Sequence, residues 1–175
     1  MLINRVWAMP NCWTFKIRPI ADLLARYVGD GKEWFDPFSG MFSPASVTND
    51  LNPESKALYH FDALDFLKQL KGQFKGVLFD PPYSLRQVKE CYEGLGRDFT
   101  MADSQVGSWT QHKMEIANLV KPGGLALSFG WNSQGIGKQN GFEIIEILLV
   151  CHGGAHNDTI VTVEKKTQSD FGFRG

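Results

Sequence analysis

Gly76-Val77-Leu78-Phe79-Asp80-Pro81-Pro82-Tyr83 is the stretch of sequence that decides the fold. Its apolar run has the composition of a strand that is covered on both faces. Pro81 and Pro82 cannot donate hydrogen bonds to a neighbouring strand, so the backbone must leave the sheet after Asp80. In open parallel sheets, ligands bind at the carboxyl ends of the strands. The stretch therefore predicts a buried strand that delivers Asp80 and Tyr83 to a binding site.

Three further acids upstream each close a candidate strand: Asp36, Asp50 and Asp62. These strands are expected over residues 33–36, 46–50 and 57–61. A parallel sheet would bring all four acidic tips to one edge. Too few residues lie between Gly40 and Ser46 for a crossover helix, which usually needs about a dozen residues. The first crossover is therefore expected to be a loop, and the second is equally short.

The remaining elements complete an α/β pattern. Helical spacing predicts helices that start at Pro19, at Asp62 and near Trp109. Residues 121–124, Lys-Pro-Gly-Gly, predict a turn before a strand over 125–131. The two β-rich runs 142–151 and 159–163 predict a hairpin. Residues 1–11 show no firm periodicity and predict either a packed arm or a flexible lead.

Length and composition bound the class of protein. With 175 residues, of which 43% are hydrophobic, the chain is expected to form a single domain, residues 1–175, with no separate target-recognition domain. No apolar run is long enough for a membrane span and no signal pattern precedes the chain, so we expect a soluble, cytoplasmic protein. A formal net charge of −1 means that any nucleic acid must meet a local basic patch. Cys151, His152 and His156 lack a full ligand set, so no metal is expected.

Two motifs carry a family resemblance. Asp80-Pro81-Pro82-Tyr83 resembles the catalytic DPPY motif of the class I amino-methyltransferases, enzymes that use S-adenosyl-L-methionine to methylate exocyclic amines such as N6 of adenine. The segment Asp36-Pro-Phe-Ser-Gly40 resembles their cofactor loop, although Phe42 stands where that loop has its second glycine. The resemblance implies a Rossmann-like methyltransferase fold with a mostly parallel seven-stranded sheet. It also implies an antiparallel C-terminal hairpin and short or missing helices between strands 1 and 2 and between strands 2 and 3.

The catalytic motif suits the chemistry of an adenine amine. The lone pair of that nitrogen is delocalised into the ring, so a site must hold it with acceptors that favour a pyramidal geometry. The Asp80 carboxylate and the Pro81 carbonyl are candidate acceptors, and Pro82 stiffens the turn that aims them. Tyr83 offers a flat face on which an extruded base can stack.

Four cofactor contacts can be assigned roles. Asp36 is expected near the ammonium group, Gly40 allows close backbone approach, and Asp50 suits the ribose diol. Asp62 is a helix cap that, by the resemblance, also meets the adenine amino group of the cofactor. The full set of expected cofactor-binding residues is Lys16, Asp36, Pro37, Phe38, Ser39, Gly40, Asp50, Leu51, Asp62 and Ala63.

Substrate contacts are expected in the polar segment that follows Tyr83. Arg86, Lys89 and Arg97 are candidates for gripping phosphates, and Phe99 for filling the gap left by an extruded base. DNA is the expected partner, and a recognition subunit or a homodimer is an additional expectation. RNA adenine and another planar amine remain open as substrates. A cofactor-binding subunit without activity of its own, which needs a partner, is the alternative from a different class.

Overall fold

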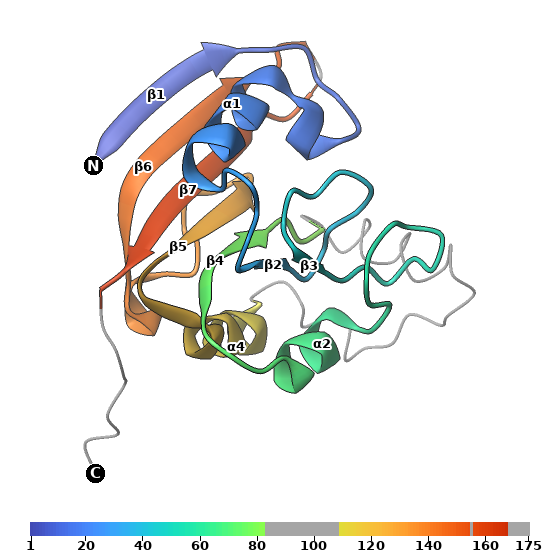
Figure 1. The fold of residues 1–175 in the computed structure, drawn as a ribbon. Coiled ribbons are helices and arrows are strands. Elements are labelled where there is room, and N and C mark those ends of the chain that lie inside the picture. The colour runs from blue at the N-terminus through green and yellow to red at the C-terminus, as the bar shows by residue number, and fades with distance from the viewer. Residues whose placement is uncertain (83–108, 155, 168–175) are drawn as a thin grey trace.

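The computed structural model describes residues 1–82, 109–154 and 156–167, and its architecture is an α/β sandwich around one sheet (Figure 1). The strand order is β1-β6-β7-β5-β4-β2-β3. Only β7 runs antiparallel to its neighbours, β5 and β6, and every other pair is parallel. The strands are β1 Leu2–Trp7, β2 Trp34–Asp36, β3 Val47–Thr48, β4 Phe74–Phe79, β5 Val120–Gly130, β6 Phe142–Cys151 and β7 Thr159–Lys166. The predicted seven-stranded, mostly parallel sheet with a C-terminal hairpin is confirmed.

Helices cover both faces of the sheet, as Figure 1 shows. Helix α1, Arg18–Tyr27, buries its apolar side on one face, where Leu78 of β4 lies. Helices α2, Ala63–Gln69, and α4, Thr110–Leu119, pack on the other face, where Val77 and Phe79 lie. Two short 3-10 turns, η1 Thr14–Lys16 and η3 Lys138–Asn140, complete the described elements. Because β4 is covered on both faces, its continuous apolar composition has a structural reason.

Gly76 lets β4 lie close against β2. A Cβ atom at this position would come within 2.6 Å of the Trp34 indole ring, which is far inside van der Waals contact. Trp34 pairs directly with Gly76 in the parallel register and is buried. The glycine therefore makes room for a large aromatic side chain in the core beneath the candidate site.

Neither of the first two crossovers contains a helix, as predicted. The expected strand over residues 57–61 is reduced to a single parallel bridge between Asn49 and Tyr59, so this expectation was wrong. The buried side chain of Asn49 replaces the missing ladder: its Nδ2 donates to the carbonyls of Pro37 and Phe61, each at 3.1 Å, and its Oδ1 accepts from the Phe61 N–H at 3.0 Å. One side chain thus ties two loops to the tip of β3.

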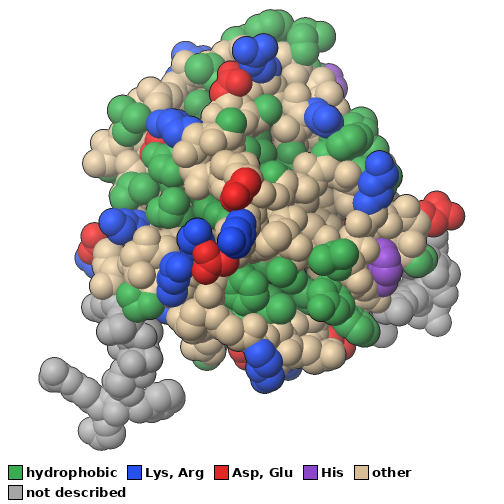
Figure 2. All heavy atoms as spheres, in the orientation of Figure 1, with side chains coloured by type: hydrophobic (Ala, Val, Ile, Leu, Met, Phe, Trp, Pro, Cys, Tyr) green, Lys and Arg blue, Asp and Glu red, His purple; other side chains and the backbone are tan. Residues whose placement is uncertain are grey.

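The outer edge of the sheet stays uncovered in this region. Residues 49–61, all of which the structure describes, form no helix over β3. Leu58, Tyr59 and Phe61 are 65%, 43% and 44% exposed. Figure 2 shows hydrophobic side chains gathered on the surface over β3 and α2. The short crossovers therefore leave apolar side chains at the surface, where a helix would cover them in a longer chain.

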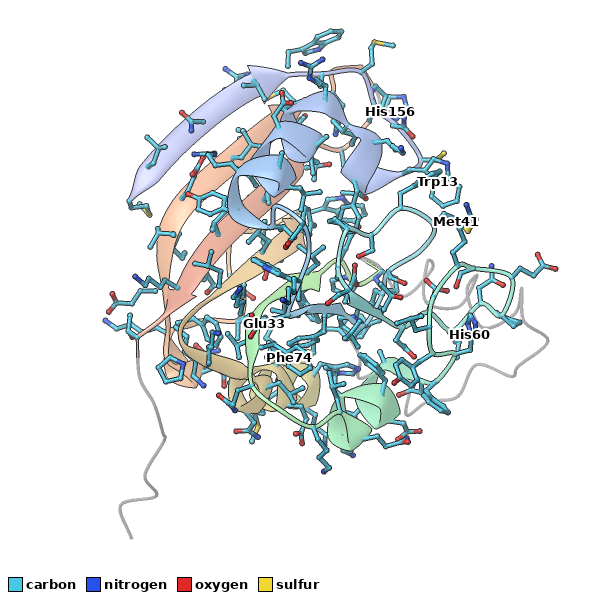
Figure 3. The ribbon with its side chains drawn as sticks, in the orientation of Figure 1. Trp13, Glu33, Met41, His60, Phe74 and His156 are labelled. Carbon is cyan, nitrogen blue, oxygen red and sulfur yellow. The ribbon has the colours of Figure 1, made fainter. Side chains whose placement is uncertain are left out.

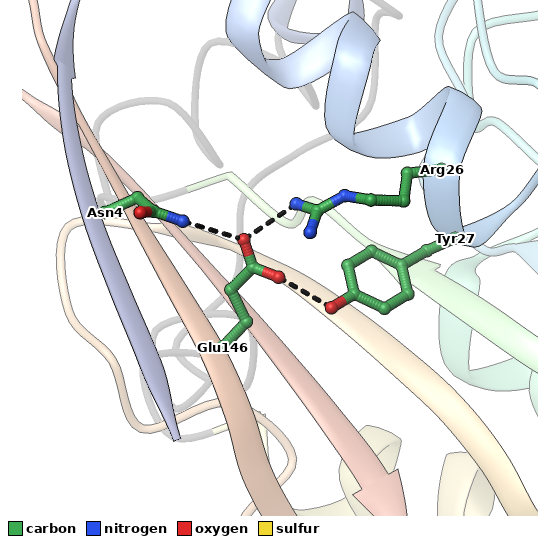
Figure 4. A network of polar contacts seen from close by, with 4 residues as sticks. All are labelled: Asn4, Arg26, Tyr27 and Glu146. Carbon is green, nitrogen blue, oxygen red and sulfur yellow. Dashed lines mark hydrogen bonds and ion pairs between the residues drawn. The ribbon is translucent and has the colours of Figure 1, made fainter.

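The amino-terminal residues form an unexpected strand. β1 pairs in parallel with β6, placing Asn4 beside Leu148. The buried Glu146 carboxylate holds this edge together: its Oε1 accepts from Asn4 Nδ2 at 3.2 Å and Arg26 Nη2 at 2.7 Å, and its Oε2 accepts from the Tyr27 hydroxyl at 2.6 Å (Figure 4). The network connects β1, α1 and β6, so the first residues are a packed arm.

Residues 121–124 interrupt β5 without ending it. Val120 pairs with Phe74 and Leu125 pairs with Gly76, so the intervening Lys-Pro-Gly-Gly forms a bulge. A Cβ atom on Gly124 would lie 2.8 Å from the Lys75 carbonyl oxygen of β4. The predicted turn is therefore a local departure inside a longer strand, because glycine allows the chain to rejoin β4 closely. Within the described residues, no helix is long and apolar enough to cross a membrane.

Candidate active site

The carboxyl ends of β2, β3 and β4 meet at one edge of the sheet. Asp36 is the last residue of β2, Asp80 directly follows β4, and Asp50 follows β3 by two residues. These strands are mutually parallel through β2. The charges of Asp80 and Asp50 both help to raise the pKa of Asp36, which places the three carboxylates within electrostatic reach. The structure thus brings together three of the four predicted acids through their strands.

Asp36 is fully buried at the centre of this edge. Its Oδ1 accepts from the Phe38 N–H at 2.9 Å, and its Oδ2 accepts from the Ser43 hydroxyl at 2.6 Å. Burial raises the pKa of Asp36 to about 8, against the lowering effect of these two hydrogen bonds. A buried acid that resists ionisation beside two other acids favours a cationic ligand, because a positive charge restores the carboxylate.

The loop after β2 folds back onto Asp50. The Gly40 N–H donates to Asp50 Oδ2 at 2.8 Å, and Asp50 Oδ1 accepts from the Asn52 N–H at 2.8 Å. Gly40 has a φ of +54°, while a Cβ atom there would meet nothing within 4 Å. Glycine is therefore required for the backbone conformation and not for space within the chain itself. Pro37 and Ser39 of this loop are buried, and Phe38 and Leu51 are half-buried.

Asp62 caps helix α2. Its Oδ1 accepts from the Leu64 N–H at 2.9 Å and the Asp65 N–H at 3.4 Å, so the predicted capping role is confirmed. The next residue, Ala63, is buried. Burial lowers the pKa of His112, on α4, to about 4, while the Asp62 charge acts in the opposite direction. A neutral imidazole therefore lies near the fourth acid, a neighbour that only the packing of α2 against α4 reveals.

Asp80 and the two prolines stand directly after the central strand. Asp80 and Pro82 are half-buried and Pro81 is buried. The other expected catalytic residue, Tyr83, lies outside the described residues, as do the four expected substrate contacts Arg86, Lys89, Arg97 and Phe99. The described part of the motif is thus positioned beside Asp36, as the sequence predicted.

An aromatic cluster joins the two motifs. The Trp109 ring lies 5.2 Å from Phe38, 6.2 Å from Phe79 and 4.8 Å from His112, measured between ring centroids. Phe38 follows Asp36 by two residues, and Phe79 precedes Asp80. Trp109 adopts a left-handed backbone, with a φ of +48°, which is rare for a bulky residue. No sequence signal predicted this contact, because it joins segments far apart in the chain.

Lys16, at the end of η1, lies against the cofactor-like loop. Its Nζ lies 4.4 Å from the centroid of the Phe42 ring. Trp13 packs on the same ring in an edge-on arrangement, with the centroids 5.4 Å apart. Figure 3 shows Trp13 and Met41 at the same end of the molecule. Lys16 therefore approaches the loop through Phe42, the residue at which the loop departs from the family pattern.

A polar pocket of about 230 Å³ lies beside this loop. Its wall contains Ser39, Gly40, Thr48 and Lys56, but none of the four acids. The Ser39 hydroxyl is buried and has no hydrogen-bond partner among the described residues. Because Gly40 contacts both this pocket and Asp50, the loop separates the pocket from the acidic edge. The candidate active site is therefore assigned to the acidic edge, where the titratable groups converge.

Comparison with solved structures identifies the fold. TrmN from Thermus thermophilus superposes with a TM-score of 0.57 at 18% identity, over 86% of this chain and 49% of TrmN, so the chain spans about half the length of TrmN. A putative methylase from Haemophilus influenzae gives a TM-score of 0.51 at 15% identity, over 91% and 92% of the two chains. The 1,6-didemethyltoxoflavin-N1-methyltransferase of Burkholderia thailandensis was solved with S-adenosylhomocysteine. It gives 0.55 at 13% identity, over 86% and 78%.

No protein-family model matches the sequence, and no curated protein matches it either. At identities this low, the structural likeness concerns the fold alone. The fold is the Rossmann-like methyltransferase fold, in agreement with the expectation drawn from the two motifs.

Proposed function

We propose that this chain is an S-adenosyl-L-methionine-dependent methyltransferase that acts on N6 of adenine in DNA. The observation that carries the proposal is the placement of Asp80, Pro81 and Pro82 at the end of the buried strand β4, beside Asp36 and Asp50. Solved proteins with this fold support it, since they include named methyltransferases and one complex with S-adenosylhomocysteine.

The residues at the acidic edge fit the parts of the proposed cofactor. Asp36, buried and with a pKa of about 8, gains its negative charge most easily beside a cation such as the ammonium group. Each Asp50 oxygen accepts one backbone N–H, and a carboxylate oxygen has a second lone pair with which to accept from a ribose hydroxyl. Asp62 and Ala63 at the start of α2 are proposed to meet the adenine. When bound, this cofactor supplies an electrophilic methyl group.

Asp80 and the Pro81 carbonyl are proposed to hold the target amine. Both acceptors sit where the chain leaves the sheet, and the prolines fix the backbone between them. Accepting the two N–H hydrogens of an exocyclic amine directs the nitrogen lone pair away from the ring plane. Adenine is the favoured substrate because related cytosine enzymes often begin this motif with Ser, whereas this chain has Asp80.

Labelled methyl transfer tests the proposal. The full chain is incubated with labelled cofactor and, in parallel, with double-stranded DNA, single-stranded DNA and RNA, and the products are digested to nucleosides. We expect N6-methyladenine from DNA, and none from the Asp80→Ala variant. Label in RNA adenine alone, or in no nucleic acid although the wild type binds the cofactor, would contradict the proposed substrate.

A further inference from the structure

We propose that Phe42 is a positioning residue that holds the Lys16 ammonium where it binds the carboxylate of the cofactor. This inference rests on the proposed function and adds a second partner for the methionine end of the ligand. The contact that carries it is the 4.4 Å approach of Lys16 Nζ to the Phe42 ring centroid. Phe42 stands where the related loop has a glycine, so this contact is a feature of the present chain.

Both partners of the contact are anchored by their neighbours. Phe15, next to Lys16, is buried and packs on Phe129 of β5 at 5.1 Å between ring centroids. The Lys16 N–H donates to the Trp13 carbonyl at 2.9 Å, which closes the turn η1. Trp13 in turn packs edge-on against Phe42. The lysine and the aromatic ring therefore meet between a turn fixed in the core and the loop after β2.

The charges of the site explain why a cation is needed here. Asp36, Asp50 and Asp80 gather at the edge and suit the positive groups of the cofactor, but they repel its carboxylate. Lys16 stands on the same loop, since Phe42 lies two residues after Gly40, whose N–H is bound to Asp50. Among the described residues Lys16 forms no ion pair, whereas Arg18, Arg26 and Lys75 are each paired with an acid. Its charge is available for an anionic ligand.

The ring of Phe42 does what a glycine cannot. A lysine side chain has four rotatable bonds, and ordering it for a ligand costs conformational entropy. The face of an aromatic ring attracts an ammonium and narrows its range of positions before the ligand arrives. The Phe42 ring is 41% exposed, so it supports the ammonium at the surface without burying it.

Calorimetric titration of the full chain with two ligands tests the role. S-adenosyl-L-methionine carries the carboxylate, and decarboxylated S-adenosylmethionine lacks it but keeps the sulfonium, the amine and the adenosine. We expect Lys16→Met to weaken binding of the first ligand about ten- to a hundredfold and to leave the second unchanged. Phe42→Leu should weaken the first ligand about two- to tenfold, and Phe42→Tyr should bind like the wild type.

A double variant separates positioning from independent contacts. If Phe42 acts through Lys16, then Phe42→Leu should cause no further loss in the Lys16→Met background. Equal weakening of both ligands by either variant would overturn the inference, because it would indicate a general change in loop shape. Unchanged cofactor binding together with weaker DNA binding would also overturn it, in favour of a phosphate contact. A wild-type chain that binds neither ligand would refute the proposed function itself. Thermal unfolding of each variant checks that the fold is intact.

Discussion

The Ser43 hydroxyl donates a 2.6 Å hydrogen bond to Oδ2 of Asp36, the acid that ends β2. Ser43 lies on the far side of the loop from Asp36 in sequence, and the bond closes that loop around a fully buried carboxyl group. The same arrangement that shapes the loop also takes Asp36 out of water. A group placed in this way is expected to contribute to ligand binding at the cost of stability, and the balance depends on pH.

The stability of the chain should respond to pH through Asp36. In the folded chain the pKa of Asp36 is about 8, while its ordinary value is 3.8. The folded state therefore binds more protons between these values. The stability from this group is fully present below pH 3.8 and is lost as the pH rises through 8. The loss is at most about 1.4 kcal/mol per pH unit.

Asp36→Asn should remove this dependence. An asparagine can accept from the Phe38 N–H and donate to Ser43, so both loop bonds remain possible. We expect the free energy of unfolding of the variant, relative to the wild type, to rise between pH 5 and pH 9 in denaturant titrations. The exposed Asp30→Asn should track the wild type at every pH. Parallel curves for wild type and Asp36→Asn would show that the carboxyl group is ionised at neutral pH.

Asp80→Ala should separate catalysis from cofactor binding. The proposed partner of Asp80 is the target amine, so the variant should keep most of its cofactor affinity and lose about 10²- to 10³-fold in kcat. Single-turnover methyl transfer and calorimetry measure the two quantities separately. Asp22→Ala, an exposed acid on α1, serves as the control. Near-normal turnover on DNA by Asp80→Ala would refute the central assignment.

Asp50→Ala should weaken cofactor binding by about 1 to 3 kcal/mol, because two ribose hydroxyls lose their acceptor. The variant also leaves the N–H groups of Gly40 and Asn52 without their partner, so part of the loss comes from the loop. Comparing the cofactor with a 2′-deoxyribose analogue isolates the ribose part. The wild type should prefer the ribose ligand, and Asp50→Ala should bind both ligands alike. An undiminished preference in the variant would assign the ribose contact to another residue.

Glu146→Ala should destabilise the fold by about 2 to 4 kcal/mol, because it leaves Asn4, Arg26 and Tyr27 without their shared acceptor. Burial would raise the pKa of Glu146, but the hydrogen bonds from Arg26 and Tyr27 lower it overall. The stabilisation is therefore present above the ordinary value and is lost as the pH falls through the folded pKa.

Thermal and chemical unfolding at pH 7 and at pH 3 measure the effect of Glu146. The exposed Glu143→Ala on the same strand is the matched control and should change stability little. Equal losses for Glu143→Ala and Glu146→Ala would show that the network contributes nothing beyond the helix and sheet contacts around it.

The acidic edge could be predicted from the sequence because its signals are local. An apolar run followed by an acid and a chain-breaking residue describes β2 with Asp36 and β4 with Asp80, and each run lies within a few residues. The absent crossover helices could be predicted too, since they follow from the number of residues between strands. The helix cap at Asp62 is equally local.

The packing around these acids could not be predicted. Trp109 and His112 reach Phe38 and Asp62 only because α4 packs against α2, and nothing in their own segment indicates that contact. Asn49 read as an ordinary strand residue, yet its side chain takes the place of a strand ladder. Such contacts depend on which distant segments become neighbours.

The sequence by itself therefore determined the class of fold and the acids at the strand tips, because strand composition, prolines, glycines and loop lengths act over a few residues. Tertiary structure alone decided the seventh strand. Residues 2–7 have no alternating pattern of their own, and they form β1 only because β6 offers an unpaired edge and Glu146 offers a buried acceptor to Asn4. It also decided the ionisation of Asp36, since a carboxyl group changes its pKa only when the surrounding fold excludes water from it.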